Sequence, residues 1–443
     1  MEDQHDLSDI DNKSSYSTDT ENKSSSIDDK SDNQTINFNA QLFEKETTGD
    51  QSMFGAFVIL INTAIGSGCL MVPYCYRLGI VSALLIAIII GIITFSTFTM
   101  MIEAAFITKK YDFRGLFTHL FNPKFIWVLD LFIFLVQIGS VMIYSNWDGV
   151  LVNRTLGLKI KVLNSDKFWN FATTLLLAFP MTIPKSIAKL EIASSVGFLL
   201  ILILISHSLY WLIKDVKEYG FDPNKELTLF HWDILIFIPA LGINTMSYNC
   251  IINLFPTLEH LRNCTVKRGI TLSGIIITAC FFLYATFGIC TYLDKFDLLS
   301  ASSALELYPA KNPFTIVATV CVIFILLVSS PLMIWAARNS VDATLFKGKE
   351  MTNLRWILTG FILCLLSAGL AATSSNILIF FNIVGGILIP VVTLLFPALF
   401  FMKATPNRKW YRTVQALISI LFTVIAAVAC TAQTALEIKN SSK

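Results

Sequence analysis

Two stretches of this sequence could expose main-chain groups to a ligand inside an otherwise apolar helix. The first, residues 53–79, carries Gly66-Ser67-Gly68 at its middle and Pro73 five residues further on. Glycine weakens a helix and proline removes a backbone donor, so we expect the helix to open near Gly68. The free N–H groups of a half-helix that starts there would attract a carboxylate, and the glycines would let it approach closely.

The second stretch, residues 234–258, is polar around Met246. It gathers the following residues in one apolar run: Pro239, Gly242, Asn244, Ser247, Asn249, Asn253 and Pro256. Carbonyl groups of an opened helix, with the side chains of Ser247 and Asn249, could receive an ammonium group. An anion site that faces a cation site would bind the carboxylate and ammonium groups that all α-amino acids share. Close packing of helices at small residues is the alternative interpretation of the two glycines in the first stretch.

The elements that must position these residues are membrane helices. The chain has 443 residues and is 54% hydrophobic but only 14% charged, whereas a soluble protein carries roughly a quarter of its residues as charged side chains. Apolar runs of about 20 residues indicate membrane spans, and only helices and closed barrels satisfy their backbone in hydrocarbon. The sequence predicts eleven helical spans: 53–79, 80–107, 125–151, 168–184, 190–213, 234–258, 269–292, 314–337, 356–373, 376–402 and 413–435.

The two interrupted spans are the first and the sixth. Five spans separate their starts, so two repeats of five spans would be inverted relative to each other, a pattern that marks the binding site of secondary transporters. The fold class is therefore an all-α polytopic membrane protein with a 5+5 inverted repeat. Its predicted parts are an acidic tail (1–50), a first repeat (51–213), a second repeat (234–402), and an eleventh span with a short C-terminal tail (403–443).

Residues 1–50 differ in charge from the rest of the chain. Residues 1–50 hold 13 acidic residues and 4 Lys, and their polar composition predicts a disordered cytosolic segment that could contact cytosolic partners. With the N-terminus in the cytosol, 17 basic residues fall on the inner side and 12 on the outer side, which favours this orientation. The near-neutral net charge of +2 excludes a nucleic-acid partner.

Four local patterns are similar to signatures of the amino acid/auxin permease family, which includes sodium-coupled neutral amino acid transporters and fungal vacuolar amino acid transporters. They lie at residues 62–68, 250–259, 330–340 and 385–400. The resemblance implies a LeuT-like fold of eleven spans with a cytosolic N-terminus. It also implies, for some members, a sodium site at the positions of Asn62 and Ser329. This chain has Ile251 and Leu258 where the family often has His and Tyr.

Ionisable residues at membrane depth are functional candidates. Glu103 and Asp130 fall near the inner ends of the second and third predicted spans, and anchoring or packing is favoured over proton transfer for both. Asp148 falls similarly close to the outer end of the third span. His207 is favoured as a structural residue. The hydroxyl of Tyr144, in the third span, could close over a bound carboxylate from the outer side, and a place in the aromatic belt is the alternative.

No carboxylate lies near the middle of the first or sixth span, so nothing there would neutralise a cationic side chain. We therefore expect a secondary active transporter of neutral amino acids that couples to sodium or protons and needs no other cofactor. A sensor that signals through residues 1–50 with little flux is the alternative. An enzyme is disfavoured because no acid and base pair lies at the midplane. The plasma membrane and a vacuolar or lysosomal membrane both remain open.

Overall fold

The computed structural model describes residues 42, 51–66, 68–157, 160, 163–184, 188–220, 227–299, 303–346, 351–374 and 376–441. These residues belong to one compact unit, Ile36–Lys443. The predicted disordered tail, 1–50, lies outside the described residues apart from Leu42.

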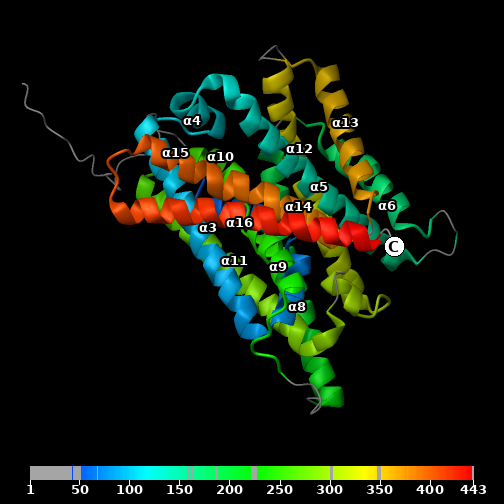
Figure 1. Ribbon diagram of the computed structural model, residues 1–443. Helices are drawn as coiled ribbons and strands as arrows, with labels where there is room; N and C mark the ends of the chain where they lie inside the picture. Colours follow the sequence, from blue (N-terminus) through cyan, green and yellow to red (C-terminus); the bar gives the residue numbers. More distant parts are fainter. Residues whose placement is uncertain are drawn as a thin grey trace, which may run out of the picture. The chain divides into compact units, whose positions relative to one another are not determined.

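Regular structure in the described part of the chain is helical, as Figure 1 shows. The α-helices are α1 (Met53–Ala64), α2 (Gly68–Cys75), α3 (Ile80–Thr108), α4 (Phe113–Leu120), α5 (Ile126–Leu156), α6 (Asp166–Ala172), α7 (Phe179–Met181), α8 (Ala188–Tyr219), α9 (Ile234–Ser247), α10 (Leu254–His260), α11 (Val266–Lys295), α12 (Pro313–Leu345), α13 (Asn353–Ala371), α14 (Ile377–Ile383), α15 (Phe396–Ala404) and α16 (Trp410–Ser441). The π-helical segments are η3 (Thr173–Ala178), η7 (Val384–Leu388) and η8 (Val391–Leu395). The 3₁₀ turns are η1 (Tyr76–Leu78), η2 (Pro123–Phe125), η4 (Ile251–Asn253), η5 (Phe296–Leu298) and η6 (Ala304–Leu307).

Among the described residues, nine helices are long and apolar enough to cross a membrane, and the bent pair of α1 and α2 makes a tenth span. These ten match all the predicted spans except the fourth. At that position α6, η3 and α7 follow one another over Asp166–Met181. Sixteen helical residues rise about 24 Å, less than the hydrocarbon thickness of about 30 Å. The expected count of eleven is thus not reached by length and composition alone.

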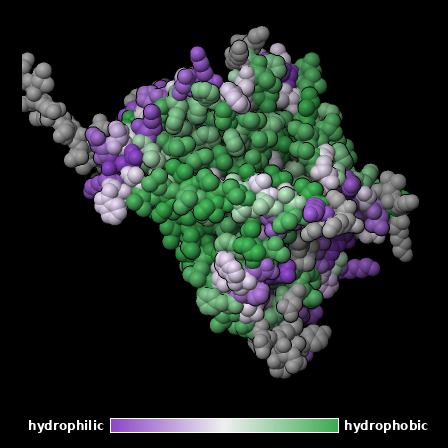
Figure 2. Space-filling view, viewed as in Figure 1, coloured by the Kyte–Doolittle hydropathy of each residue, from purple (hydrophilic) through white to green (hydrophobic). Residues whose placement is uncertain are grey.

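The bundle is organised around α5, which packs along α12 and also contacts α6 and α13. α8 packs against α12, α11 and α1, while α3 packs against α11 and α15. Figure 2 shows a broad apolar surface on one face of the molecule. Large apolar side chains on the outer helices are well exposed, among them Ile92 at 63%, Ile362 at 59% and Val428 at 66%. Apolar exposure on this scale is what a lipid-facing surface requires.

Two helical interruptions position the site. α1 starts at the N-cap Ser52, whose side chain accepts from the Gly55 amide, and ends at Ala64. α2 then leaves at an angle of 65°. α9 ends at Ser247, and a short turn, η4, separates it from α10. α2 packs directly against α9, so the ends of both broken helices come together inside the bundle.

Candidate functional site

The two breaks meet at the glycine that starts α2. A methyl group placed on Gly68 would lie 2.7 Å from the Ser247 Oγ atom and 3.1 Å from the Ser247 Cα atom. Carbon atoms normally approach to about 3.5 Å, so any side chain here would push the two helices apart. The Ser247 hydroxyl donates to the Ile243 carbonyl at 2.7 Å. Gly68 is therefore required for the close approach of α2 and α9.

Tyr284, in α11, connects the carbonyl ends of both broken helices. Its hydroxyl lies 3.0 Å from the Ala64 carbonyl oxygen and 3.0 Å from the Ser247 carbonyl oxygen. Because a hydroxyl carries one proton, it donates to one of these carbonyls at a time. Tyr284 was not among the residues predicted from the sequence. The available signal was a tyrosine inside an apolar span, where its hydroxyl needs a polar partner.

Tyr144 reaches the first break from α5 and is buried. A methyl group on Gly66 would overlap the Tyr144 hydroxyl and would lie 3.0 Å from the Cζ atom of its ring. This hydroxyl therefore lies next to the backbone that the sequence predicts to bind a carboxylate. Contact with a ligand stays a prediction. Ser67, the third predicted residue of this break, lies outside the described residues.

The second break is tied to the π-helical segments of the tenth predicted span. The Thr393 hydroxyl, in η8, donates to the Asn249 Oδ1 atom at 3.1 Å. The Thr245 hydroxyl, in α9, donates to the Gly385 carbonyl of η7. An amide oxygen can accept two hydrogen bonds, so Asn249 keeps capacity for a ligand. Thr393 was also missed by the sequence analysis.

Asn62 and Ser329, the residues expected at a sodium site, are buried with polar atoms that lack partners. Asn62 is 3% exposed and Ser329 is 1% exposed. Neither the Asn62 Nδ2 atom nor the Ser329 Oγ atom has a hydrogen-bond partner among the described residues. The Asn62 side chain lies against Gly197 of α8, where a methyl group would overlap its Oδ1 atom. Buried polar atoms without partners are costly. A cation would complete the Ser329 Oγ atom but not the Asn62 Nδ2 atom, which is a donor, so a sodium ion here would be held by the Asn62 Oδ1 and Ser329 Oγ atoms.

Two of the buried acids hold helices together. Glu103 pairs with Arg412, which joins α3 to α16. Asp130 pairs with Arg114 and accepts from the Thr344 hydroxyl at 2.7 Å. These contacts fit the anchoring role that the sequence favours for both acids. His207 is likewise held in place, since the Trp211 indole donates to its Nε2 atom at 3.1 Å.

Asp148 differs from the other acids. It is 2% exposed, and its Oδ1 atom has no hydrogen-bond partner among the described residues. The third span was expected to end at residue 151, but α5 continues to Leu156. Asp148 therefore lies eight residues, about 12 Å, inside the end of the helix. It also follows Tyr144 by one turn, on the same face of α5.

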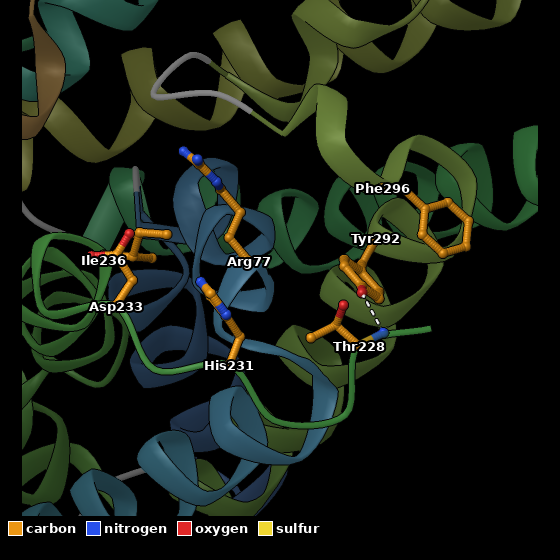
Figure 3. Close-up of a pocket in the computed structure, with 7 residues that line it drawn as sticks. All are labelled: Arg77, Thr228, His231, Asp233, Ile236, Tyr292 and Phe296. Carbon is orange, nitrogen blue, oxygen red and sulfur yellow. Dashed lines mark hydrogen bonds between the residues drawn. The ribbon is translucent and has the colours of Figure 1, made fainter. Parts of the chain in front are cut away.

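A polar pocket of about 300 Å³ lies at the end of α2. Figure 3 shows its lining residues, which come from η1 and η5, the chain between α8 and α9, the start of α9 and the end of α11: Arg77, Thr228, His231, Asp233, Ile236, Tyr292 and Phe296. The Thr228 amide donates to the Tyr292 hydroxyl at 3.2 Å. Arg77 follows Gly68 by nine residues, so this pocket lies about 14 Å along the chain axis from the first break.

The arrangement of these breaks can be compared with known proteins. A family model described as "Transmembrane amino acid transporter protein" matches residues 49–436, a range that holds both breaks. The chain belongs to this family. Its members are transporters and not enzymes, and the chain is a multi-pass membrane protein.

The individual relatives of this chain are distant in sequence. It is 21% identical to mouse solute carrier family 38 member 10, over 82% of this chain and 34% of that protein. It is 21% identical to vacuolar amino acid transporter 3 of Schizosaccharomyces pombe, over 84% of this chain and 56% of that protein. Zebrafish sodium-coupled neutral amino acid transporter 7 is 20% identical, over 69% and 68% of the two chains. The chain thus spans about a third of the length of the first relative and just over half of the length of the second.

Solved structures show the same fold at low identity. MhsT in complex with L-phenylalanine superposes with a TM-score of 0.58 at 14% identity, over 86% of this chain and 97% of that one. Mhp1, a nucleobase-cation-symport-1 family transporter, gives a TM-score of 0.58 at 11% identity, over 90% and 94% of the two chains. These likenesses show an all-helical transporter fold of the LeuT-like kind.

Proposed function

We propose that this chain moves neutral α-amino acids across a membrane by alternating access, with the coupled movement of sodium or protons. The observation that carries the proposal is the meeting of two broken helices at Gly68 and Ser247 in a chain of an amino acid transporter family. The start of α2 offers N–H groups and a positive helix end to a carboxylate. The ends of α1 and α9 offer carbonyl groups to an ammonium group.

The proposed moving part is the pair of broken spans, α1 with α2 and α9 with α10. The proposed scaffold contains α5 and α12, which pack along each other. In the 5+5 inverted repeat, Asp166–Met181 takes the place of the fourth span, so that eleven spans result. The fit to MhsT and Mhp1 supports this arrangement.

Substrates with neutral side chains are proposed because hydroxyl, amide and main-chain groups dominate the contacts at the two breaks. For the coupling ion, Asn62 and Ser329 would hold sodium through their side-chain oxygens, together with freed carbonyls of the first span. Asp148, whose Oδ1 atom has no hydrogen-bond partner among the described residues, is the candidate group for proton coupling. The chain therefore has candidate residues for coupling to sodium and for coupling to protons.

The N-terminus is proposed to be cytosolic, with the chain in the plasma membrane or in a vacuolar or lysosomal membrane. Residues 1–50 would then be available to cytosolic partners. A sensor with the same site would bind amino acids without appreciable flux, so transport measurements separate the two functions.

The test is uptake of labelled amino acids into proteoliposomes that hold the full chain, with a sodium or a proton gradient imposed one at a time. Gly68→Leu should abolish uptake because its side chain would enter the space of Ser247. Gly369→Leu is the matched control, since nothing lies within 4 Å of a methyl group at that position. Asn62→Ala with Ser329→Ala should remove sodium dependence if sodium is the coupling ion.

Absence of gradient-dependent uptake of every amino acid would refute the transport proposal. Competition in which arginine or lysine exceeds alanine, glutamine and leucine would refute the neutral specificity and leave transport intact.

A further inference from the structure

An apolar cavity and a polar pocket follow one another along α5, away from the two breaks. The apolar cavity has a volume of about 540 Å³ and is walled by α5, α13, α14 with η7, and α16. The polar pocket has a volume of about 90 Å³ and lies between α5, α6 and the end of α13. Ser374, just beyond α13, lines both, so the two spaces adjoin.

The α5 residues of both spaces form one continuous helix face. Leu135, Ile138 and Met142 line the apolar cavity, and Asn146 and Val150 line the polar pocket. Steps of three and four residues keep side chains on one side of a helix. From Leu135 to Val150 the face is about 22 Å long. One leaflet of a bilayer, with its headgroups, is about 20–22 Å thick.

The walls of the apolar cavity lie where lipid can reach them. Leu370 of α13 is 39% exposed and Ile438 of α16 is 51% exposed. α13 and α16 both carry apolar side chains on the outer surface of the bundle. Figure 1 shows α16 crossing the front of the molecule, with its C-terminal end near the lower end of α13. In a multi-pass membrane protein this surface meets hydrocarbon, so an acyl chain can enter the cavity from the membrane.

The polar pocket, unlike the apolar cavity, is lined by charged side chains. Lys167 and Asp166 start α6 and line the pocket, and both are exposed. Lys167 forms no ion pair within the described residues, and Asp166 accepts from the Asn153 side chain through one of its two oxygens, at 2.7 Å. A cation and an anion side by side suit a zwitterionic headgroup, because its phosphate and its ammonium group carry the opposite charges.

The geometry points to a binding site for a zwitterionic phospholipid. One acyl chain would fill the apolar cavity along α5, the phosphate would pair with Lys167, and an ethanolamine ammonium would pair with the other carboxylate oxygen of Asp166. The site is separate from the proposed amino acid site, and its occupant would touch Val384 of η7. The next residue of η7, Gly385, accepts from Thr245 of α9, so the lipid would support the element that holds the second break.

The test is retention of phosphatidylethanolamine by the delipidated full chain in detergent, counted by native mass spectrometry. Diacylglycerol with the same chains lacks the phosphate, and phosphatidylglycerol lacks the ammonium group. We expect one retained phosphatidylethanolamine per chain and weaker retention of both other lipids. Equal retention of the three lipids would overturn headgroup recognition at Lys167 and Asp166.

Variants test the two ends of the site. Leu370→Trp should fill the cavity and lower retention by about tenfold, or about 1.4 kcal/mol. Leu366→Trp, one turn earlier on α13 and 41% exposed, is the matched control and should retain lipid as wild type does. Lys167→Gln should lower retention by about two- to fivefold, as for a partly exposed ion pair, while Lys311→Gln should not.

Equal retention by Leu370→Trp and Leu366→Trp would overturn the proposal. If Leu370→Trp does not fold, Ile438→Trp fills the same cavity from α16 and gives the same comparison. Retention is measured without an amino acid gradient. Failure of the lipid site and failure of the transport proposal are therefore separate results.

Discussion

The contact between Gly66 and Tyr144 allows a sharp test of the site. Gly66→Ala places a methyl group that overlaps the Tyr144 hydroxyl. Overpacking of a buried contact costs about 1–3 kcal/mol. In the double variant Gly66→Ala with Tyr144→Phe the hydroxyl is gone, and the nearest remaining ring atom would be Cζ at 3.0 Å. A shift of a few tenths of an ångström relieves this close contact. The double variant should therefore recover most of the free energy of unfolding that Gly66→Ala loses.

The assay is the free energy of unfolding of the purified chain in detergent, for wild type, both single variants and the double variant. We expect a coupling energy of about 1–2 kcal/mol between the two positions, as is usual for residues in contact. Additive effects of the two substitutions would refute the contact. Uptake gives an independent result: if the Tyr144 hydroxyl binds the substrate carboxylate, the double variant regains stability but not transport.

Three further predictions concern other contacts. Tyr284→Phe removes the donor shared by the Ala64 and Ser247 carbonyls and should lower the unfolding free energy by about 1–3 kcal/mol; an unchanged melting temperature would contradict the shared bond. Arg412→Met leaves Glu103 buried without its partner and should cost about 3 kcal/mol, whereas Lys409→Met should cost little. Burial raises the pKa of the Cys264 thiol from 9.0 to about 12, so from pH 9 to 12 the unfolded chain loses this proton first and stability falls as pH rises. Cys264→Ala should flatten that part of the melting profile, and an equally steep profile would contradict the burial effect.

The membrane spans could be predicted from sequence because a bilayer forces long apolar runs into helices. The breaks could also be located, since Gly66 and Gly68 weaken the first span locally and the sixth span is polar around Met246, next to Ser247, where α9 ends. Pro73 and Pro239 lie inside α2 and α9 and do not mark the breaks. The partners across the breaks could not. Tyr284 and Thr393 are single polar residues in apolar runs, and only the packing of α11 and η8 against the broken helices gives them their contacts.

The helix α5 extends five residues beyond 151, the predicted end of the third span, for a physical reason. The polar stretch Asn153-Arg154-Thr155 resembles the start of a loop. Instead the Arg154 guanidinium donates to the carbonyls of Leu305, Glu306 and Tyr308, and α5 continues until Gly157, whose φ of +53° ends it. The carbonyls come from a segment about 150 residues away in the chain, so no local pattern could reveal them.

This longer α5 changes what Asp148 can do. Asp148 lies buried two turns inside the helix, and its Oδ1 atom has no partner in the part of the chain that the structure describes. Such a carboxylate would be costly as an anion. Asp148 therefore either binds a proton or pairs with a cation. Tyr144, one turn away on α5, lies against Gly66 at the first break. If Asp148 couples protons, Asp148→Asn should abolish proton-driven uptake of alanine while leaving exchange of internal for external alanine. If it instead meets a cationic side chain, wild type should transport arginine, and Asp148→Asn should lose arginine but keep alanine. If Asp148→Asn keeps proton-driven uptake of alanine and wild type does not transport arginine, both roles of Asp148 are refuted.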